Sequence, residues 1–358
     1  MTAYAEFNRL GQSLWLDNLS RSLLKEGGLA RYVEAGVSGV TSNPTIFHKA
    51  VSDSPYYKDD LARLKAREPD PEARYEALVV EDIRAACDLL KPVHDASAGD
   101  DGYVSLEVAP RLAHDAAATV AEAKRLSALV GRENLLIKVP ATPAGASAFE
   151  QLTAEGYRLN ITLLFSIEQT LRVFDAYLRG ARAWLAKGGD PRRLKAVASL
   201  FLSRVDTLAD KRLEAIGTEE ALSLRGKTAV AMAKNAYRRY QELFHGPAFA
   251  DLKLRGVRPQ YLLWASTGTK NPAYSDLLYV EPLVGAETIN TLPDKTLAAV
   301  ADHALPKSTI EQGSAEAATH LARLQTLGIA PEQLGEELQV EGLRLFSESF
   351  DQMIDLMR

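Results

Sequence analysis

Eight short apolar runs, each followed by a longer stretch of helical periodicity, constrain the fold of this chain more than any other feature. Strands that alternate with helices predict a parallel sheet, because each helix returns the chain to the edge where the next strand begins. Eight such units predict a closed (β/α)8 barrel of the TIM type. The predicted strands are residues 13–18, 36–43, 102–110, 135–142, 157–165, 195–203, 261–266 and, more weakly, 277–285.

The alternative arrangement is an open, doubly wound sheet with helices on both faces. Such sheets normally carry a glycine-rich phosphate loop after an early strand, of the form G-x-G-x-x-G or G-x-x-x-x-G-K-[ST]. Neither pattern occurs in the 358 residues. The closed barrel is therefore the favoured architecture.

Two regions exceed the needs of a barrel. Residues 46–100, between the second and third predicted strands, form a helical excursion that the breaker "EPDPE" at 68–72 divides in two. C-terminal helices are expected over residues 313–358, with an apolar stripe that should pack against the barrel. Neither region has the size or linker composition of an independent domain, so residues 1–358 are expected to form one domain. The stripe consists of Leu338, Leu343, Phe346, Phe350, Met353 and Met357.

Composition and charge exclude several classes of function. A net charge of −5 gives no electrostatic case for binding nucleic acid or an anionic membrane. The single cysteine, Cys87, excludes an intramolecular disulfide and a thiolate metal cluster, as expected in a reducing cytosol. No secretory signal begins the chain, and no run approaches the ~18 apolar residues of a membrane span. A cytoplasmic protein with no nucleic-acid or membrane partner is predicted.

Alternation of side chains places one lysine inside the predicted barrel. In a strand, one parity faces the barrel interior and the other faces the helices. In "LLIKVP" the apolar residues Leu135, Ile137 and Val139 share one parity and should face the helices. Lys138 has the other parity and should point into the barrel, where burial of an ammonium group is costly.

The same reasoning sends polar side chains inward from five other strands. Each lies in the C-terminal half of its strand or at its end, which is the rim where barrel enzymes build their active sites. Together with Lys138 they form a predicted catalytic pocket of one lysine, two carboxylates, two carboxamides and several hydroxyls. The inward residues are Ser13, Trp15, Asp17, Thr41, Asn43, Ser105, Glu107, Asn160, Thr162, Ser199 and Phe201.

Each of these residues also has a purely structural interpretation. Asp17 could cap the helix that follows it, and Asn43, which precedes a proline, could serve a turn. Glu107 and Lys138 could form a buried ion pair, although such pairs carry desolvation costs. Asn160 and Thr162 could satisfy each other. The structural interpretation requires all of these at one end of one barrel, whereas a single pocket explains them together.

A buried lysine beside two carboxylates favours imine chemistry. Desolvation among apolar neighbours disfavours a lysine's ammonium form, and the free amine attacks carbonyl groups to form a Schiff base. Two carboxylates in different surroundings can divide the proton transfers that iminium formation and carbon–carbon cleavage require. None of the six histidines joins the rim set, so neither metal-dependent hydrolysis nor a Ser-His-Asp triad is supported.

A phosphate site is predicted after the sixth and seventh strands. Arg204 follows the sixth strand, while Ser266 and Lys270 follow the seventh in "WASTGTKNP". Late loops of this fold commonly bind phosphate, and amide groups of a Ser/Thr/Gly turn suit an anion. The alternative is an ordinary turn with a solvated lysine.

These residues resemble the transaldolase family, and more specifically its longer bacterial branch. The matching stretches occur in family order, span about residues 13–275 and continue in "VGAETINTLPDKTLAAV". They are "LWLDNLSR", "GVTSNPTIF", "VSLEVAPRL", "LLIKVPATPAG", "LNITLLFS", "SLFLSRVD" and "WASTGTKNPAYSD".

The resemblance implies a cofactor-free reaction on sugar phosphates in the pentose phosphate pathway. A dihydroxyacetone unit would pass reversibly from sedoheptulose 7-phosphate to glyceraldehyde 3-phosphate, giving erythrose 4-phosphate and fructose 6-phosphate. Lys138 matches the Schiff-base lysine, and Glu107 matches an acid that acts through a water positioned by Thr162. Asp17 matches the base that takes the C4 hydroxyl proton. Substrate-binding residues by the same resemblance are Asn43, Asn160, Ser199, Phe201, Arg204, Ser266 and, in place of an expected arginine, Lys270.

One departure and two rival functions accompany the resemblance. The shorter branch has an arginine where this chain has Gly268, which leaves Lys270 as the second phosphate-binding cation. The first rival is a fructose 6-phosphate aldolase, whose members tend to carry Gln and Tyr where this chain has Glu107 and Phe201. The second is a catalytically silent barrel that only binds sugar phosphates. A monomer and a homodimer are both compatible with the sequence.

Overall fold

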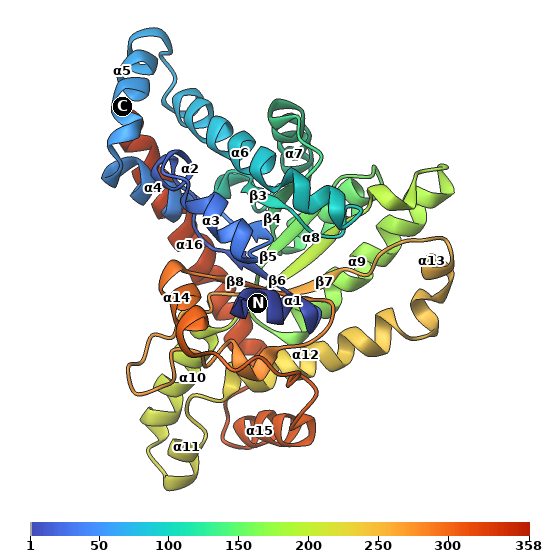
Figure 1. Ribbon diagram of the computed structural model, residues 1–358. Coiled ribbons are helices and arrows are strands. Elements are labelled where there is room, and N and C mark those ends of the chain that lie inside the picture. The colour runs from blue at the N-terminus through green and yellow to red at the C-terminus, as the bar shows by residue number, and fades with distance from the viewer. Residues whose placement is uncertain (1) are drawn as a thin grey trace.

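A closed ring of parallel strands forms the centre of the computed structural model, which describes residues 2–358 (Figure 1). The strands follow one another around the ring in chain order, and β1 closes it by pairing with β8. The predicted (β/α)8 barrel is therefore confirmed. The strands are β1 (Gln12–Leu16), β2 (Gly39–Val40), β3 (Val104–Glu107), β4 (Leu135–Pro140), β5 (Leu159–Leu164), β6 (Ala196–Phe201), β7 (Tyr261–Ala265) and β8 (Thr288–Leu292).

The prediction for the eighth strand was wrong. Residues 277–285 form turns and the short 3-10 helix η5 (Glu281–Leu283), and β8 begins at Thr288. The segment that was taken for a strand runs outside β8 and accepts hydrogen bonds from it, since Asn290 Nδ2 donates to the carbonyl of Tyr279 at 2.9 Å. The sequence pattern missed β8 because polar residues occupy helix-facing positions of this strand, where the pattern requires apolar residues.

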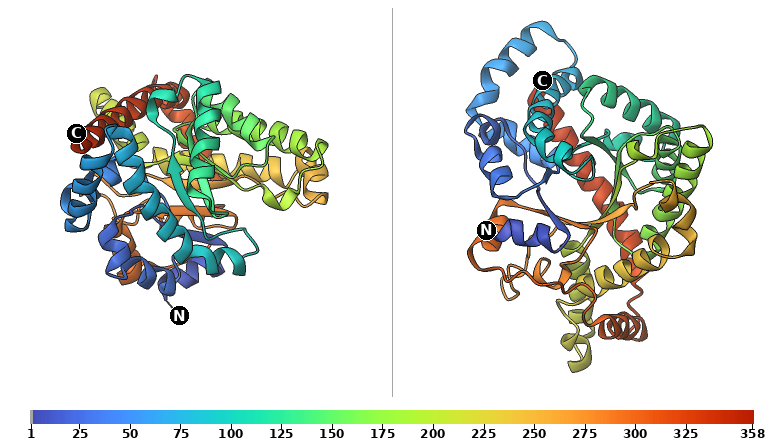
Figure 2. Two further views of the ribbon diagram at one scale, coloured as in Figure 1. Left: turned by 90° about the horizontal axis from the view of Figure 1, so that it is seen from above. Right: turned by 45° about the vertical axis from the view of Figure 1, so that its right-hand side comes forward.

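Helices surround the ring and complete each strand-to-strand connection (Figures 1 and 2). Several begin with a cap directly after a strand: Thr142 caps α8 with Pro143 in its first turn, and Ser166 caps α9. Around the barrel lie α1 (Ala3–Arg9), α2 (Arg21–Lys25), α3 (Gly28–Ala35), α7 (Ala116–Val130), α8 (Pro143–Thr153), α9 (Ile167–Ala186), α10 (Ser203–Ile216), α11 (Glu219–Ser223), α12 (Thr228–Phe244), α13 (Ala250–Leu254) and α14 (Asp294–His303), with short 3-10 turns η2 (Pro110–Leu112), η3 (Pro191–Arg193) and η4 (Pro247–Phe249).

The two predicted excursions are helical. Between β2 and β3 the chain forms α4 (Pro44–Asp53), η1 (Pro55–Tyr57), α5 (Lys58–Arg67) and α6 (Pro71–Ala96), and the predicted breaker separates α5 from α6. The C-terminal region forms α15 (Ser314–Thr326) and α16 (Pro331–Met357).

The last helix, α16, runs diagonally across the molecule and packs against α4, α6 and the end of β5 (Figure 2). Five residues of its predicted apolar stripe are buried and Leu343 is partly buried against the core, which confirms the predicted packing.

A second buried lysine closes the opposite, N-terminal end of the barrel. Lys195 directly precedes β6, and its Nζ lies 2.8 Å from Asp100 Oδ1 and 3.8 Å from the centre of the Tyr261 ring. Burial lowers the pKa of Lys195, and Asp100 opposes that shift. This lysine is fully enclosed by its partners, so its position at the barrel base reads as a structural ion pair.

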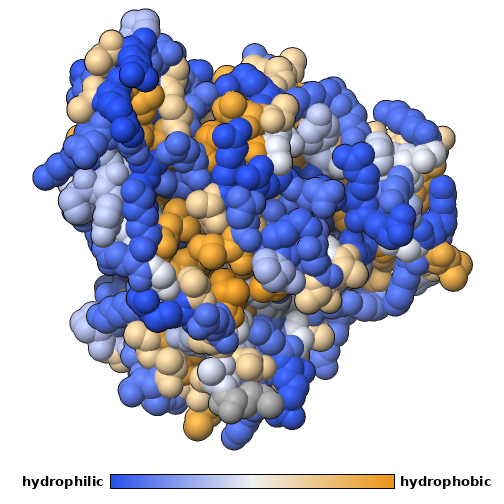
Figure 3. Space-filling view, turned by 45° about the horizontal axis from the view of Figure 1, so that its top comes forward, coloured by the Kyte–Doolittle hydropathy of each residue, from blue (hydrophilic) through white to orange (hydrophobic). Residues whose placement is uncertain are grey.

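The outer surface is mostly hydrophilic, and hydrophobic side chains gather mainly in a hollow at the centre of the face shown in Figure 3. Among the helices of residues 2–358, none has the length and apolar character that a membrane span requires.

Candidate active site

Lys138 lies in the barrel interior, as its parity predicts. It is the fourth residue of β4, and its side chain is 6% exposed. Its Nζ donates to the carbonyl of Ser42 at 3.2 Å, and the nearest carboxylate oxygen, Glu107 Oε2, is 3.4 Å away. The Phe346 ring, from α16, lies 6.0 Å from the same nitrogen. The amine is thus buried between a carboxylate and an aromatic ring.

Glu107 stands beside Lys138 because β3 and β4 pair those two residues in register. Both of its carboxylate oxygens are buried and accept no hydrogen bond from the described residues. Burial raises the pKa of Glu107, the Lys138 charge opposes this, and Asp17 adds to the rise. The pair that sequence analysis offered as a structural alternative therefore exists, yet Glu107 keeps its hydrogen-bonding capacity unused.

Asp17, directly after β1, forms a second acidic group in the same space. Its Oδ1 accepts a hydrogen bond from Thr41 Oγ1 at 2.7 Å, and the Thr41 hydroxyl lies 2.6 Å from that of Thr291. Burial raises the pKa of Asp17, while the Thr41 hydrogen bond and Lys138 act to lower it. The following helix α2 is capped by Ser20, so the alternative role of Asp17 as a helix cap is wrong.

Asn160 and Thr162 project inward from β5 but form no hydrogen bond with each other. Asn160 is fully buried, donates to Ser105 Oγ at 3.1 Å and accepts from Ser199 Oγ at 2.7 Å. Thr162 Oγ1 is buried and has no hydrogen-bond partner among the described residues. The alternative in which Asn160 and Thr162 form a hydrogen bond with each other is therefore wrong.

Asn43 combines two roles. Its Oδ1 accepts from the Ile46 amide at 3.0 Å and so caps α4, while its side chain also lines the cavity next to Lys138. The structural and the functional interpretation of this residue hold together, because a carboxamide has a separate amino group for a second partner.

Cationic side chains lie where β6 and β7 end. Arg204, in the first turn of α10, lies with its guanidinium carbon 5.7 Å from the centre of the Phe201 ring. Its Nη1 is buried and finds no acceptor among the described residues. Ser266 has a φ of +54°, which is rare for a residue other than glycine, and its Oγ lies 2.8 Å from Ser203 Oγ. Lys270 borders the same space.

One cavity of about 290 Å³ at the C-terminal end of the barrel joins these groups. Glu107 and Asn160 do not line it: they lie behind its wall, in contact with Lys138 and Ser199 respectively. The predicted residues that line it are Asp17, Thr41, Asn43, Lys138, Thr162, Ser199, Phe201, Arg204, Ser266 and Lys270.

Sequence reasoning missed part of the lining. Thr291 was lost with the misplaced β8, and correct placement of that strand would have found it by parity. Phe346 was assigned to packing alone, and no local signal indicates that α16 reaches the cavity. The remaining unpredicted lining residues are Thr45, Ile46, Leu263 and Ala265.

Helix α16 is held at the cavity by Gln339. Its Nε2 donates at 3.0 Å to the carbonyl of Ala141, after β4, and at 3.0 Å to that of Leu163, in β5. Leu163 has a φ of +61° and lies in an irregular stretch of the β5–β6 register. A Cβ at Gly335 would lie 2.6 Å from Ser166 Cβ, so only glycine permits the helix to approach this closely.

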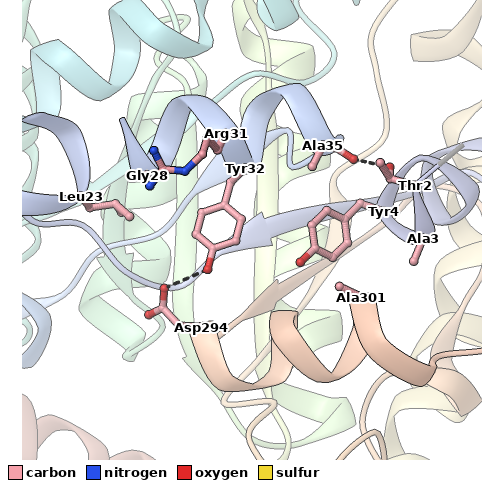
Figure 4. Close-up of a pocket in the computed structure, with 10 residues that line it drawn as sticks. All are labelled: Thr2, Ala3, Tyr4, Leu23, Gly28, Arg31, Tyr32, Ala35, Asp294 and Ala301. Carbon is pink, nitrogen blue, oxygen red and sulfur yellow. Dashed lines mark hydrogen bonds between the residues drawn. The ribbon is translucent and has the colours of Figure 1, made fainter. Parts of the chain in front are cut away.

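A larger cavity, of about 750 Å³, lies outside the barrel among α1, α3 and α14 (Figure 4). Its polar groups include Arg31, Tyr32 and Asp294, and none of the predicted site residues lines it. Because the convergent lysine and carboxylates lie in the barrel cavity, that cavity is the candidate active site.

Comparisons with known proteins show the family of the chain. Residues 14–357 match the family described as "Transaldolase/Fructose-6-phosphate aldolase". A protein of Thiobacillus denitrificans named Transaldolase is 61% identical over 355 residues, covering 99% of each chain. A Transaldolase of Neisseria gonorrhoeae is 47% identical over 99% of each chain. A Transaldolase of Mycolicibacterium smegmatis is 46% identical over 98% of this chain and 95% of its own.

The Lys138–Glu107 pair predicts a pH-dependent cost of removing the lysine. Because the folded-state pKa of Glu107 is already raised, the folded protein loses stability as pH rises above the carboxyl's unfolded value. Lys138→Met removes the charge that offsets Glu107. It should lower the free energy of unfolding, relative to wild type, by about 3 kcal/mol at pH 8 and by clearly less at pH 5. Urea denaturation at both pH values measures it.

The double variant Lys138→Met/Glu107→Gln is the matched control, since it leaves no buried charge at the pair. Its free energy of unfolding should change less between pH 5 and pH 8 than that of Lys138→Met. An equal loss at both pH values for Lys138→Met alone would contradict the electrostatic explanation.

Proposed function

This chain belongs to the transaldolase/fructose-6-phosphate aldolase family, and from that membership we propose its substrates and covalent mechanism. Near full-length relatives identify the enzyme as a transaldolase. The proposed reaction moves a dihydroxyacetone unit from sedoheptulose 7-phosphate to glyceraldehyde 3-phosphate, giving erythrose 4-phosphate and fructose 6-phosphate reversibly. The observation that carries the proposal is an inward, buried Lys138 amine with two carboxyl groups of raised pKa in the same space.

Lys138 is the proposed nucleophile. Its neutral Nζ attacks the C2 carbonyl carbon of the ketose, and the resulting carbinolamine loses its hydroxyl as water to leave an iminium ion. Glu107, 3.4 Å from Nζ, supports the proton transfers of this step, because a carboxyl of raised pKa holds a proton that it can donate. Thr162, whose hydroxyl is buried nearby in β5, is proposed to position the water that relays the proton.

Asp17 is the proposed base for carbon–carbon cleavage. Its carboxylate takes the C4 hydroxyl proton, the C3–C4 bond breaks, and the bonding electrons enter the iminium to form a neutral enamine. The aldose phosphate leaves, and the enamine carbon then attacks the carbonyl of the acceptor aldehyde. The Thr41 hydrogen bond fixes one Asp17 oxygen, which leaves the other for the substrate.

Amide and hydroxyl groups would hold the three-carbon unit. Asn43 presents its amino group to the cavity while its Oδ1 caps α4. Ser199 reaches the cavity directly, and Asn160 supports it from behind through the 2.7 Å hydrogen bond. Phe201 provides an apolar wall and packs under Arg204. We propose no cofactor for these steps.

The phosphate group would bind where β6 and β7 end. The buried Nη1 of Arg204, which has no acceptor within residues 2–358, supports an anion there, and Ser266 and Lys270 border the same space. Gly268 provides no side chain, so Lys270 supplies the second charge as a point cation rather than a planar fork.

Other expectations about the protein stay predictions. They are a cytoplasmic location, a monomeric or homodimeric state, and the absence of nucleic-acid and membrane partners.

Borohydride reduction tests the nucleophile. With fructose 6-phosphate present, reduction should add a sugar-derived fragment to the peptide that contains Lys138, read by mass spectrometry. Lys195 is an internal control, because it is also buried but lies at the opposite end of the barrel. An adduct elsewhere, or none, would refute the mechanism.

An acceptor requirement distinguishes the transferase from an aldolase. Fructose 6-phosphate alone should yield little free dihydroxyacetone, because the enamine stays bound until an aldehyde attacks it. Adding erythrose 4-phosphate should raise glyceraldehyde 3-phosphate formation at least tenfold in a coupled assay. Rapid cleavage without an acceptor would overturn the transferase assignment.

Loss of the phosphate-binding cations should discriminate between substrates. Arg204→Ala should reduce kcat/KM for fructose 6-phosphate by about 10- to 100-fold, the effect of one charged hydrogen bond, and Lys270→Ala by less. The much slower reaction of unphosphorylated fructose should change little. A similar loss for both sugars would indicate that Arg204 has no phosphate-specific role.

A further inference from the structure

The residue after Asp17 connects the candidate base to a second carboxylate. Asn18 Nδ2 donates to Asp294 Oδ2 at 2.7 Å, and the Asp17 amide donates to the carbonyl of Leu292 at 2.8 Å. Both contacts arise because β1 and β8 are neighbouring parallel strands that end together. Asp294 is two residues past the end of β8, so the pairing of the two strands carries it beside the end of β1.

Asp294 lies at the start of a helix and faces solvent. It is the first residue of α14, where the free amide groups of a helix N-terminus favour an anion. It is also exposed and lines the outer cavity, where the Tyr32 hydroxyl lies 3.5 Å from its Oδ1 (Figure 4). Its carboxylate is therefore hydrated on that side.

Neighbouring groups shift the pKa of Asp17 in opposite directions. Lys138 of β4, Lys270 of the β7 loop and the Thr41 hydroxyl stabilise its ionised form. Burial and the negative charge of Asp294 act in the other direction, and Glu107 also interacts with Asp17 electrostatically. With two cations nearby, an uncompensated Asp17 would be a weak base, since basicity falls as the anion is stabilised.

We propose that Asp294 is a positioning residue for this reaction: its hydrogen bond to Asn18 fixes the end of β1, and its carboxylate places a negative charge close to Asp17. The inference rests on the proposed role of Asp17 in taking the C4 hydroxyl proton. Asp294 itself stays outside the cavity and does not touch the substrate, so its effect passes through Asp17.

Asp294→Asn tests the charge, because asparagine can still accept the hydrogen bond from Asn18. Removing a negative charge lowers the pKa of Asp17, so the acid limb of the kcat/KM profile should move to lower pH by roughly half a unit. Plateau kcat should fall a few-fold, as expected for a weaker base. The shift of the acid limb relative to wild type should be smaller at 0.5 M salt, because salt screens the charge of the solvent-exposed Asp294.

Two further variants separate charge from structure. Asn18→Ala keeps both carboxylates but loses the hydrogen bond, so it should lower kcat without moving the acid limb. Asp302→Asn removes an exposed carboxylate from the other end of α14 and should leave both kcat and the limb unchanged.

NMR titration of protein labelled with carboxyl-¹³C aspartate provides a readout that does not depend on turnover. The Asp17 resonance, assigned with Asp17→Asn, should titrate at lower pH in Asp294→Asn. If neither the Asp17 titration nor the acid limb moves in Asp294→Asn, the inference about Asp294 is overturned and the proposed function still stands. Failure of Lys138 to form the borohydride adduct, or full activity in Asp17→Asn, would instead overturn the proposed function.

Discussion

The pairing of Glu107 with Lys138 is the constraint around which the site is built. Two adjacent strands place an ammonium and a carboxylate 3.4 Å apart in the barrel interior, where each alone would be strongly destabilising. A core made for stability alone would replace such a pair with apolar side chains. Its retention at the C-terminal end, where neither Glu107 oxygen accepts a hydrogen bond from residues 2–358, is consistent with the proposed reactive centre. The Lys195–Asp100 pair at the other end has its contacts filled and serves the barrel.

The remaining parts of the site come from elements distant in the sequence. Helix α16 reaches the cavity through Phe346 and is fastened to the ends of β4 and β5 by Gln339. Helix α4 contributes Asn43 at its cap and is tied to α16 by the 2.8 Å hydrogen bond from Thr45 to Ser349. The two segments that exceed the needs of a barrel thus meet over its open end, where they enclose the amine.

The strand periodicity was sufficient to predict the barrel and the inward direction of Lys138. Side chains alternate along a strand, and in a closed sheet one parity faces the interior while the other faces the helices. The periodicity failed at β8, where Thr288 and Asn290 occupy helix-facing positions and donate hydrogen bonds to the preceding segment. Parity also could not tell which inward residues reach the cavity. Asn160 is covered by Ser199, and Glu107 lies behind Lys138, because depth along the barrel axis depends on strand stagger.

By itself, therefore, the sequence determined the fold class, the inward direction of Lys138 and the identity of most polar groups around it. These follow from local alternation and from motifs carried within single strands and their ends. The tertiary structure alone decided that Phe346 borders the amine, that Gln339 fastens α16, and that Asp294 accepts a hydrogen bond from Asn18, next to Asp17. Each of those contacts joins residues about 200 or more positions apart, and no local periodicity encodes where two such segments meet.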